Sequence, residues 1–274
     1  MMQKNISVIV STYNSPLWLQ KVLWGYNTQT YRNFELIIAD DGSGEETYQL
    51  IEQMKKEVFY PIVHVWHEDN GFQKSQILNK ATLTSTTDYI MMSDGDCIPR
   101  PDFVEQHIKF REEGFFLSGG YHKLPLDLSK ALTKDDIYSG RCFDVSWLKK
   151  NGMPNSFKNT KVDADGVFSD VFNLLTPTTP SWNGHNASGW KSDILAVNGF
   201  DERMQYGGQD RELGERLVNY GIIAKQIRYS TVCLHLDHPR GYATPDSINK
   251  NKEIRRITKE EGKKGTDYGI IKSK

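Results

Sequence analysis

Short apolar runs alternate with amphipathic segments along the first hundred residues. The runs are rich in β-branched residues, as in buried strands, and predict strands over 6–10, 34–39, 62–66 and 89–92. Between them, apolar residues recur three and four positions apart, as at Trp18 and Val22, which predicts helices. Ser43 and Glu46 have the spacing of a capping box, which predicts the start of the second helix. Repeated strand–helix units predict an α/β fold whose mostly parallel sheet has helices on both faces.

The pattern is less regular beyond residue 100. Apolar spacing still predicts a strand over 115–118, a helix over 191–197, a helix after Asp210 and a strand-like run from Thr231. Residues 122–180 show no clear period, which fits a variable insertion.

The composition is ordinary for a soluble globular protein. The chain has 274 residues, of which 38% are hydrophobic and 25% charged, enough for one large α/β domain or two small ones. A net charge of −1 gives no field that would attract nucleic acid. The three cysteines lack metal-ligand spacing, and the N-terminal apolar run is too short for a signal peptide, so we expect reduced thiols and a cytoplasmic location.

The C-terminal segment over 246–274 is polar and basic. Residues 249–274 hold nine lysines or arginines and four acidic residues. The composition predicts a solvated or frayed tail. The alternative is an electrostatic contact with a partner or with an anionic membrane surface, which would place the protein peripherally at the inner face of the membrane.

Polar loops follow three of the predicted strands, and ligands of parallel sheets bind beyond such strand ends. A single residue separates Asp94 from Asp96, so an extended backbone directs both carboxylates to one side. The residue between them is Gly95, which permits close approach of a ligand. Mg²⁺ and Mn²⁺ favour carboxylate oxygens, which predicts a metal site here; the alternative is a solvated turn. Because no glycine-rich phosphate loop is present, a metal that bridges two phosphates is the expected way to hold a nucleotide.

Two later segments add candidate chemistry. Asp210 follows two glycines at the start of a predicted helix, where it either caps the helix or acts as a general base. His235 and His238 are three residues apart and end a strand-like run. One or both could bind the same cation, since Mn²⁺ accepts imidazole beside carboxylate; the alternative is surface or capping histidines.

Together these segments resemble the family-2 glycosyltransferases with the GT-A fold. The resemblance covers about residues 4–240 and rests on VIVSTYN at 8–14, ELIIADDGS at 35–43, DNGFQK at 69–74 and DGD at 94–96. The part from Gly189 to Glu212 looks like that of galactosyltransferase and chondroitin-polymerase-type enzymes. The resemblance implies a GT-A domain over 1–245, with a nucleotide-sugar half over 4–120 and an acceptor-side catalytic half over 121–245, before the basic tail.

The resemblance also implies roles for individual residues. The donor nucleotide and its phosphates would be bound by Thr12, Tyr13, Asn14, Asp41, Lys74, Asp94 and Gly95. The metal, Mn²⁺ or Mg²⁺, would be bound by Asp96, by His235 or His238, and by Asp94 if that residue does not serve the ribose. Asp210 would be the catalytic base. Sugars would contact Asn186, Trp190, Gly208 and Gln209, although core packing is the alternative for Trp182 and Trp190. Many relatives have glutamate where this chain has Gln209, so its sugar preference stays open.

The resulting prediction is an inverting, metal-dependent transferase that moves a hexose or N-acetylhexosamine from a UDP-sugar to a hydroxyl of a glycan or a lipid-linked sugar. One rival is a nucleotidyltransferase, which would usually show a glycine-rich basic loop where this chain has STYNSP over 11–16. The other is a catalytically silent module that binds a sugar nucleotide or a glycan, against which the presence of both Asp96 and Asp210 argues.

Overall fold

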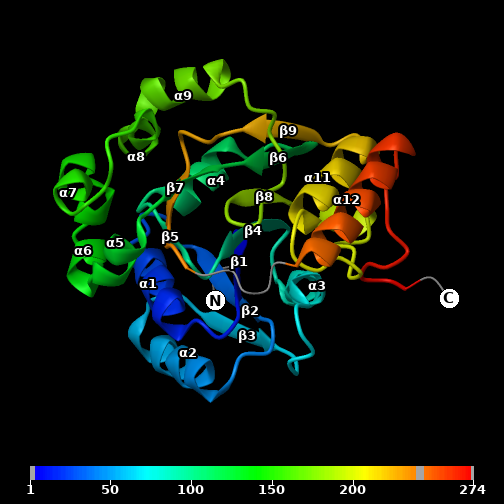
Figure 1. The fold of residues 1–274 in the computed structure, drawn as a ribbon, viewed down its shortest axis with the longest axis horizontal. Helices are drawn as coiled ribbons and strands as arrows, with labels where there is room; N and C mark the ends of the chain where they lie inside the picture. The colour runs from blue at the N-terminus through cyan, green and yellow to red at the C-terminus, as the bar shows by residue number, and fades with distance from the viewer. Residues whose placement is uncertain (1–3, 239–243, 273–274) are drawn as a thin grey trace.

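The fold is built on a central sheet and a small second sheet (Figure 1), as described by a computed structural model for residues 4–238 and 244–272. The strands are β1 (Ile6–Thr12), β2 (Phe34–Asp40), β3 (Ile62–Trp66), β4 (Tyr89–Asp94), β5 (Cys97–Pro99), β6 (Phe115–Ser118), β7 (Gly120–Lys123), β8 (Ala187–Trp190), β9 (Ile223–Gln226) and β10 (Val232–His235). Within these residues, a seven-stranded sheet has the order β3-β2-β1-β4-β8-β6-β9, and a three-stranded sheet has the order β5-β10-β7.

Helices surround both sheets. They are α1 (Pro16–Asn27), α2 (Glu45–Glu57), α3 (Lys74–Thr84), α4 (Phe103–Phe110), α5 (Leu126–Ala131), α6 (Lys134–Tyr138), α7 (Val145–Lys150), α8 (Thr160–Asp163), α9 (Gly166–Leu175), α10 (Lys191–Ala196), α11 (Gln209–Tyr220) and α12 (Pro245–Glu260), with 3₁₀ turns η1 (Arg141–Phe143) and η2 (Phe157–Asn159).

Successive residues of β1 point into two different cores. Val8 and Val10 pack with residues of α1 and α2, whereas Ile9 packs with residues of α3 and α11. Side chains alternate along a strand, so a strand covered on both faces must be apolar at consecutive positions. Every residue of β1 and β2 is buried, which explains the consecutive apolar residues over 8–10 and 36–39. The two polar residues that interrupt the strands pair with each other, since the Ser7 hydroxyl donates to Glu35 over 2.6 Å.

The mostly parallel sheet flanked by helices confirms the predicted fold class. β1 pairs in parallel with β2 and β4, and β2 pairs in parallel with β3, while β8 is antiparallel to β4 and β6. The register places Thr12 beside Asp40 and Ser11 beside Asp94. The three polar loops predicted at strand ends therefore meet at one edge of the sheet.

The predicted capping box at the second helix is wrong. α2 begins after Gly44, which has no side chain to cap it. The Ser43 hydroxyl instead accepts a hydrogen bond of 2.8 Å from the amide of Asn14, and the Ser43 amide donates to Asp40. Ser43 thus connects the loops after β1 and β2 rather than starting the helix.

The region without a clear period, 122–180, forms short helices. Apolar residues of α5, α6 and α7 complete the core on the α1 side of the sheet, among them Leu128, Ile137 and Leu148. The helices α5, α6, α7 and α8 have six residues or fewer, so no 3.6-residue period emerges from them. The ten-residue α9 does carry apolar residues at helical spacing, and the sequence prediction missed it.

The basic C-terminal segment is folded, so the expectation of a frayed tail is wrong for residues 245–272. α12 packs along α11, and Thr258 donates a hydrogen bond of 2.9 Å to Glu212 within this contact. The Asn251 amide group donates to the carbonyl groups of three consecutive residues before α11. Farther on, Asn198 bonds the backbone of Ile271. In the part of the chain described, no helix is long and apolar enough to cross a membrane.

Candidate active site

A cavity of about 950 Å³ opens beyond the carboxyl ends of β1, β2 and β4. Most of the residues predicted to bind donor, metal or acceptor line it: Thr12, Tyr13, Asn14, Asp41, Lys74, Asp94, Gly95, Asp96, Gly208, Gln209, Asp210, His235 and His238. The fold therefore gathers residues from both halves of the chain around a single space.

The loops after β1 and β2 are fastened to each other at one end of this cavity. Asn14 has a left-handed backbone, with φ of 43°, and its side-chain oxygen accepts a 2.9 Å hydrogen bond from the amide of Gly44. The Tyr13 hydroxyl donates to Asp69 over 2.8 Å. Asparagine tolerates this conformation better than most residues, so the sequence at this turn suits the loop it must form.

Asp41 is held in place by two donors. The imidazole Nε2 of His67 lies 2.8 Å from one carboxylate oxygen, and the amide of Gln73 donates to the other over 2.9 Å. Burial raises the pKa of Asp41, although both of these contacts oppose the change. Its neighbour Asp40 bonds His64 and the Ser43 amide and does not line the cavity.

Lys74 and Asp94 form an ion pair of 2.6 Å on the cavity wall, and the Ser11 hydroxyl also donates to Asp94 over 2.8 Å. Burial alone would raise the pKa of Asp94, but the charge and hydrogen bond of Lys74, together with smaller effects that include the Ser11 hydrogen bond, lower that pKa to about 2. Burial likewise opposes the charge on Lys74, while Asp94 and Asp210 raise the pKa of Lys74 above its usual value. Both groups are therefore charged at neutral pH.

Gly95 is required by the packing of the protein itself. Its amide donates to the Ser11 carbonyl over 2.7 Å, and a Cβ at this position would lie 2.9 Å from that oxygen. The close neighbour of this glycine is therefore β1, and not a ligand as its place between the two aspartates predicts.

Asp96 and two histidines form a candidate metal centre. The Asp96 Oδ2 atom lies 2.8 Å from Nε2 of His238 and 3.6 Å from Nε2 of His235. The antiparallel pairing of β5 with β10 sets Cys97 opposite His235, and the Leu236 amide donates to the Asp96 carbonyl, so backbone bonds bring these distant segments together. Carboxylate and imidazole ligands on one side of a cavity fit a divalent cation such as Mn²⁺.

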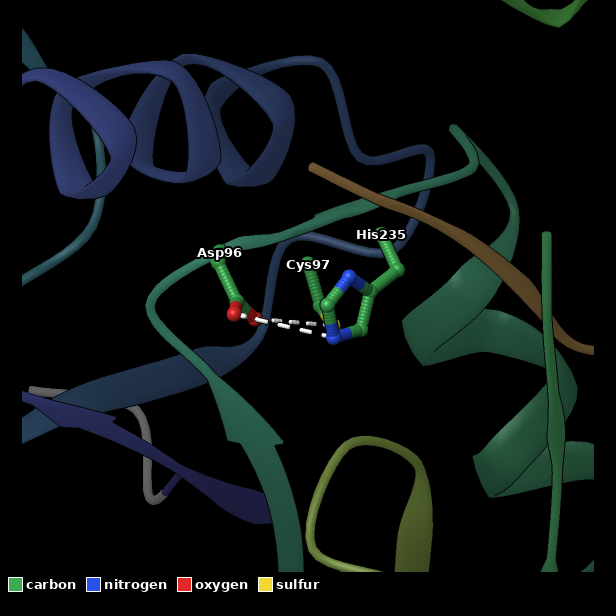
Figure 2. A group of neighbouring side chains, drawn as sticks. All are labelled: Asp96, Cys97 and His235. Atoms are coloured by element: carbon green, nitrogen blue, oxygen red, sulfur yellow. Dashed lines mark hydrogen bonds and ion pairs between the residues drawn. The ribbon is translucent and has the colours of Figure 1, made fainter. Parts of the chain in front are cut away.

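Cys97 also lies close to two of these residues, and Figure 2 shows it beside Asp96 and His235. Its ligand atom and theirs lie within 4.8 Å of one another. Burial raises the pKa of the Cys97 thiol well above its usual value, and the sulfur lies 3.3 Å from Asp96 Oδ1. Mn²⁺ and Mg²⁺ favour carboxylate oxygens over thiolate sulfur, so Cys97 is the least suited of these side chains to bind either cation.

Asp210 lies in the first turn of α11 with one oxygen unpaired. The residue that precedes the helix is Gly208, with φ of 91°, and no side chain caps the start of the helix. The interpretation of Asp210 as a helix cap is therefore wrong. The Oδ1 atom is buried and has no hydrogen-bond partner among the described residues. Burial raises the pKa of Asp210, and the Lys74 ammonium opposes this in part. A buried carboxylate with a raised pKa is suited to accept a proton.

Comparison with known proteins places this site in context. Residues 7–126, which contain the loops after β1, β2 and β4, match the family described as glycosyl transferase family 2. This segment of the chain belongs to that family. The chain is 28% identical to the hyaluronan synthase of Pasteurella multocida over 81% of its length, and 24% identical to the chondroitin synthase of Escherichia coli over 85% of it. It spans only 24% and 35% of those two proteins.

Other relatives are nearer in length or known in structure. The glycosyltransferase YfnE of Bacillus subtilis, described as uncharacterized, is 27% identical over 89% of this chain and 68% of its own length. The mannosyltransferase PcManGT of Pyrobaculum calidifontis superposes with a TM-score of 0.59 at 18% identity, covering 95% of this chain and 63% of that one. S. aureus TarS gives 0.62 at 12% identity, covering 94% and 41%. These likenesses show the GT-A fold.

Two of the predicted sugar contacts, Asn186 and Trp190, do not lie in the cavity, so these two predictions are wrong. Asn186 is fully buried, where its side chain bonds His107 and the carbonyl of Gly120. Trp190 pairs with Tyr89 at the opposite end of β4, and its indole nitrogen donates to the backbone of Glu112. Trp182 is also fully buried and packs in the core with Phe116.

The cavity includes His185 and Tyr121, which the sequence analysis missed. His185 is in the polar segment GHNASGW over 184–190, so the signal was present but was attributed to Asn186 and Trp190. Its ring packs against Tyr121 with centroids 4.6 Å apart. Burial lowers the pKa of His185 to about 4, so the imidazole is neutral at pH 7. Tyr121 lies on β7 and faces the cavity only because β7 pairs with β10.

Proposed function

We propose that this chain is an inverting, metal-dependent glycosyltransferase that moves a hexose or N-acetylhexosamine from a UDP-sugar to a hydroxyl of a glycan or a lipid-linked sugar. Asp210 serves as the general base. The observation that carries the proposal is the state of the carboxylates that line the cavity.

Four carboxylates of the described residues line the cavity, and three of them are engaged. Asp41 is bonded to His67 and Gln73, and Asp94 to Lys74 and Ser11. Asp96 contacts the histidines of the candidate metal centre. Asp210 alone among the four has a buried oxygen without a hydrogen-bond partner, so it is the carboxylate available to take a proton from an acceptor hydroxyl.

The donor side of the proposal is supported by the loops that the resemblance assigns to the nucleotide. Thr12, Tyr13, Asn14 and Asp41 lie together at the ends of β1 and β2. Among structures of the same fold, TarS has been solved with UDP and with UDP-GlcNAc, and PcManGT with GDP-Man and Mn²⁺. These complexes support a nucleotide-sugar donor, and the motif resemblance favours UDP over GDP.

The metal side of the proposal concerns Asp96, His235 and His238. These side chains, with Asp94 nearby, would hold Mn²⁺ or Mg²⁺ beside the donor diphosphate. The cation would supply charge neutralisation for the departing nucleotide diphosphate. Lys74 adds a permanent positive charge on the same wall, next to Asp94.

The acceptor reaction follows from the position of Asp210. Asp210 accepts the proton of the acceptor hydroxyl as that oxygen forms a bond to the anomeric carbon of the sugar. The bond from the anomeric carbon to the diphosphate breaks on the opposite face, and its electron pair leaves with the nucleotide. One displacement inverts the anomeric configuration and needs no covalent intermediate on the enzyme.

Metal-dependent release of UDP from a panel of UDP-sugars tests this proposal. The panel contains UDP-galactose, UDP-N-acetylgalactosamine, UDP-glucose and UDP-N-acetylglucosamine, with and without mono- and disaccharide acceptors, in Mn²⁺, Mg²⁺ or EDTA. Wild-type protein should release UDP only with metal, and Asp210→Asn should lower turnover by ~10²–10⁴-fold while it still binds UDP. An equally active Asp210→Asn variant would sink the assignment of the base, and UDP binding without any turnover would favour the silent binding module.

A further inference from the structure

Helix α9 presents its apolar side to solvent. Five large apolar residues recur along one side of it at helical spacing, and Phe157 of η2 extends the same surface. Their exposed fractions run from 47% at Val171 to 85% at Leu174. We call this surface the α9 stripe, and it consists of Phe157, Val167, Phe168, Val171, Leu174 and Leu175. A surface helix of a globular protein normally turns such a stripe toward the core.

The opposite, polar side of α9 is fixed to the protein by hydrogen bonds. Ser169 is buried, and its hydroxyl lies 3.1 Å from that of Ser230. Asn173 donates to Ser230 over 2.8 Å and accepts from the Tyr229 amide over 2.7 Å. Rotating the helix to bury the stripe would break these bonds, so an apolar environment outside the described chain must cover the stripe if it is covered at all.

Cations stand beside the stripe. Phe172 of α9 stacks on Tyr229 with ring centroids 5.0 Å apart, and the Lys161 ammonium lies 5.9 Å from the Tyr229 ring. Lys158 follows Phe157 in the chain, and Arg228 precedes Tyr229. Basic residues next to an aromatic and aliphatic surface are typical of segments that lie in a membrane interface.

These cations lack acidic partners. Among residues 4–238 and 244–272, no ion pair involves Lys158, Lys161 or Arg228, although ion pairs are frequent elsewhere on the surface. Burial lowers the pKa of Lys161, and repulsion by Arg228 and Lys158 lowers it further. The Nε atom of Arg228 is buried with no acceptor in this part of the chain. The group is therefore complementary to an anion.

We propose that the α9 stripe, with Lys158, Lys161 and Arg228 beside it, binds the surface of a phospholipid bilayer that carries anionic headgroups. The apolar side chains enter the boundary of the acyl chains, and the cations contact headgroup phosphates. A second copy of the chain fits less well, because a two-fold dimer through the stripe would bring two sets of unpaired cations to one interface. The surface is separate from the basic C-terminal segment, whose helix packs on α11.

Flotation of the full chain with lipid vesicles tests this proposal. One vesicle contains only phosphatidylcholine, and the other contains phosphatidylcholine with phosphatidylglycerol. The stripe variant carries Phe168→Ser, Leu174→Ser and Leu175→Ser. Its matched control carries Leu83→Ser and Val218→Ser, which change large apolar residues that are also more than half exposed, at 54% and 51%, but lie on α3 and α11. A charge variant carries Lys158→Gln and Lys161→Gln.

Wild type and the control should bind the anionic vesicles, and the stripe variant should bind them about tenfold more weakly or not at all. The charge variant should lose its preference for anionic over neutral vesicles, and added salt should produce the same loss in wild type.

The proposal is overturned if wild type binds neither vesicle or if the stripe variant binds the anionic vesicles as well as the control does. A dimer of wild type that the stripe variant abolishes, without vesicle binding, would instead assign the stripe to a second copy. Thermal unfolding of each variant checks that it is folded, and none of these readouts depends on the proposed transferase activity.

Discussion

Gly184 lies directly against the carboxylate of Asp210. A Cβ on Gly184 would stand 2.8 Å from Asp210 Oδ2 and 2.9 Å from Oδ1, closer than ordinary van der Waals contact. Burial raises the pKa of Asp210, whereas the Lys74 ammonium and, to a smaller extent, the backbone amide of Gly184 lower it. The loop before β8 therefore sets the position of the proposed base, which comes from a different element, α11.

Replacement of this glycine should impair catalysis without loss of the fold. Gly184→Ala forces the Asp210 carboxylate to move by several tenths of an ångström or more, and we expect turnover to fall by ~10–10²-fold, because a base must be aligned with the hydroxyl it deprotonates. Gly265→Ala is the matched control, since a Cβ there meets only the Val197 carbonyl at 3.8 Å. Steady-state UDP release measures both, and equal rates would contradict the role assigned to Gly184.

The pH dependence of turnover should report the raised pKa of Asp210. The base must be ionised to act, so activity is lost as the pH falls through its pKa. Burial raises that pKa, so the loss should begin above the pH of about 4 expected for an ordinary aspartate. The Lys74 ammonium lowers the pKa of Asp210, and Lys74→Met should therefore move the acidic limb to higher pH.

The comparison for Lys74 is Lys123→Met. Lys123 also lines the cavity, but it forms an ion pair of 2.9 Å with Asp237 and is not among the largest causes of the pKa shift of Asp210. Turnover is measured against pH at saturating donor, so that weaker donor binding in the Lys74 variant does not alter the profile. An acidic limb that stays in place or moves to lower pH in Lys74→Met would refute the electrostatic coupling.

Metal affinity should depend on Asp96 and the histidines and not on Cys97. Asp96→Asn and His238→Ala should each raise the Mn²⁺ concentration for half-maximal activity by about 10–100-fold, the order of loss seen when metal sites lose a supporting contact. Cys97→Ser should leave this Mn²⁺ concentration nearly unchanged, because Mn²⁺ favours carboxylate and imidazole ligands over thiolate. Mn²⁺ titration after EDTA treatment measures this, and His235→Ala in the same series shows which histidine contributes more. A large effect in the Cys97 variant would make the thiol a ligand.

A buried ion pair supports the helix that carries Asp210. The Arg216 guanidinium donates to both oxygens of Glu212 within α11, and both side chains are almost fully buried. Arg216→Met leaves a buried carboxylate without its cation, so the free energy of unfolding in urea should fall by ~3–5 kcal/mol. Arg256→Gln removes an exposed ion pair with Glu253 on α12 and should leave the free energy of unfolding nearly unchanged. Similar unfolding midpoints for the two variants would show that the buried pair adds little.

Local chemistry explains how much of the site could be predicted. A strand buried on both faces needs an unbroken apolar run, and the polar residues that follow it must lie at the edge of the sheet. The loops of Tyr13, Asp41 and Asp94 could therefore be placed together by sequence pattern alone, because each lies next to its own strand and parallel strands end at the same edge. The capping prediction at Ser43 is wrong for a related reason, because it considered only neighbours along the chain. The Ser43 hydroxyl instead accepts a hydrogen bond from Asn14 in the loop after β1.

The sequence by itself determined the fold class, the edge of the sheet that carries the chemistry, and the residue types that gather there. Only the tertiary structure decided which distant residues reach that edge. The pairing of β5 with β10 brings His235 to Asp96. The antiparallel insertion of β8 brings His185 into the cavity and Gly184 against Asp210, but it directs Asn186 and Trp190 away from the cavity. Periodicity depends on neighbours along the chain, whereas these contacts depend on strand pairing and close packing between segments that are far apart in sequence.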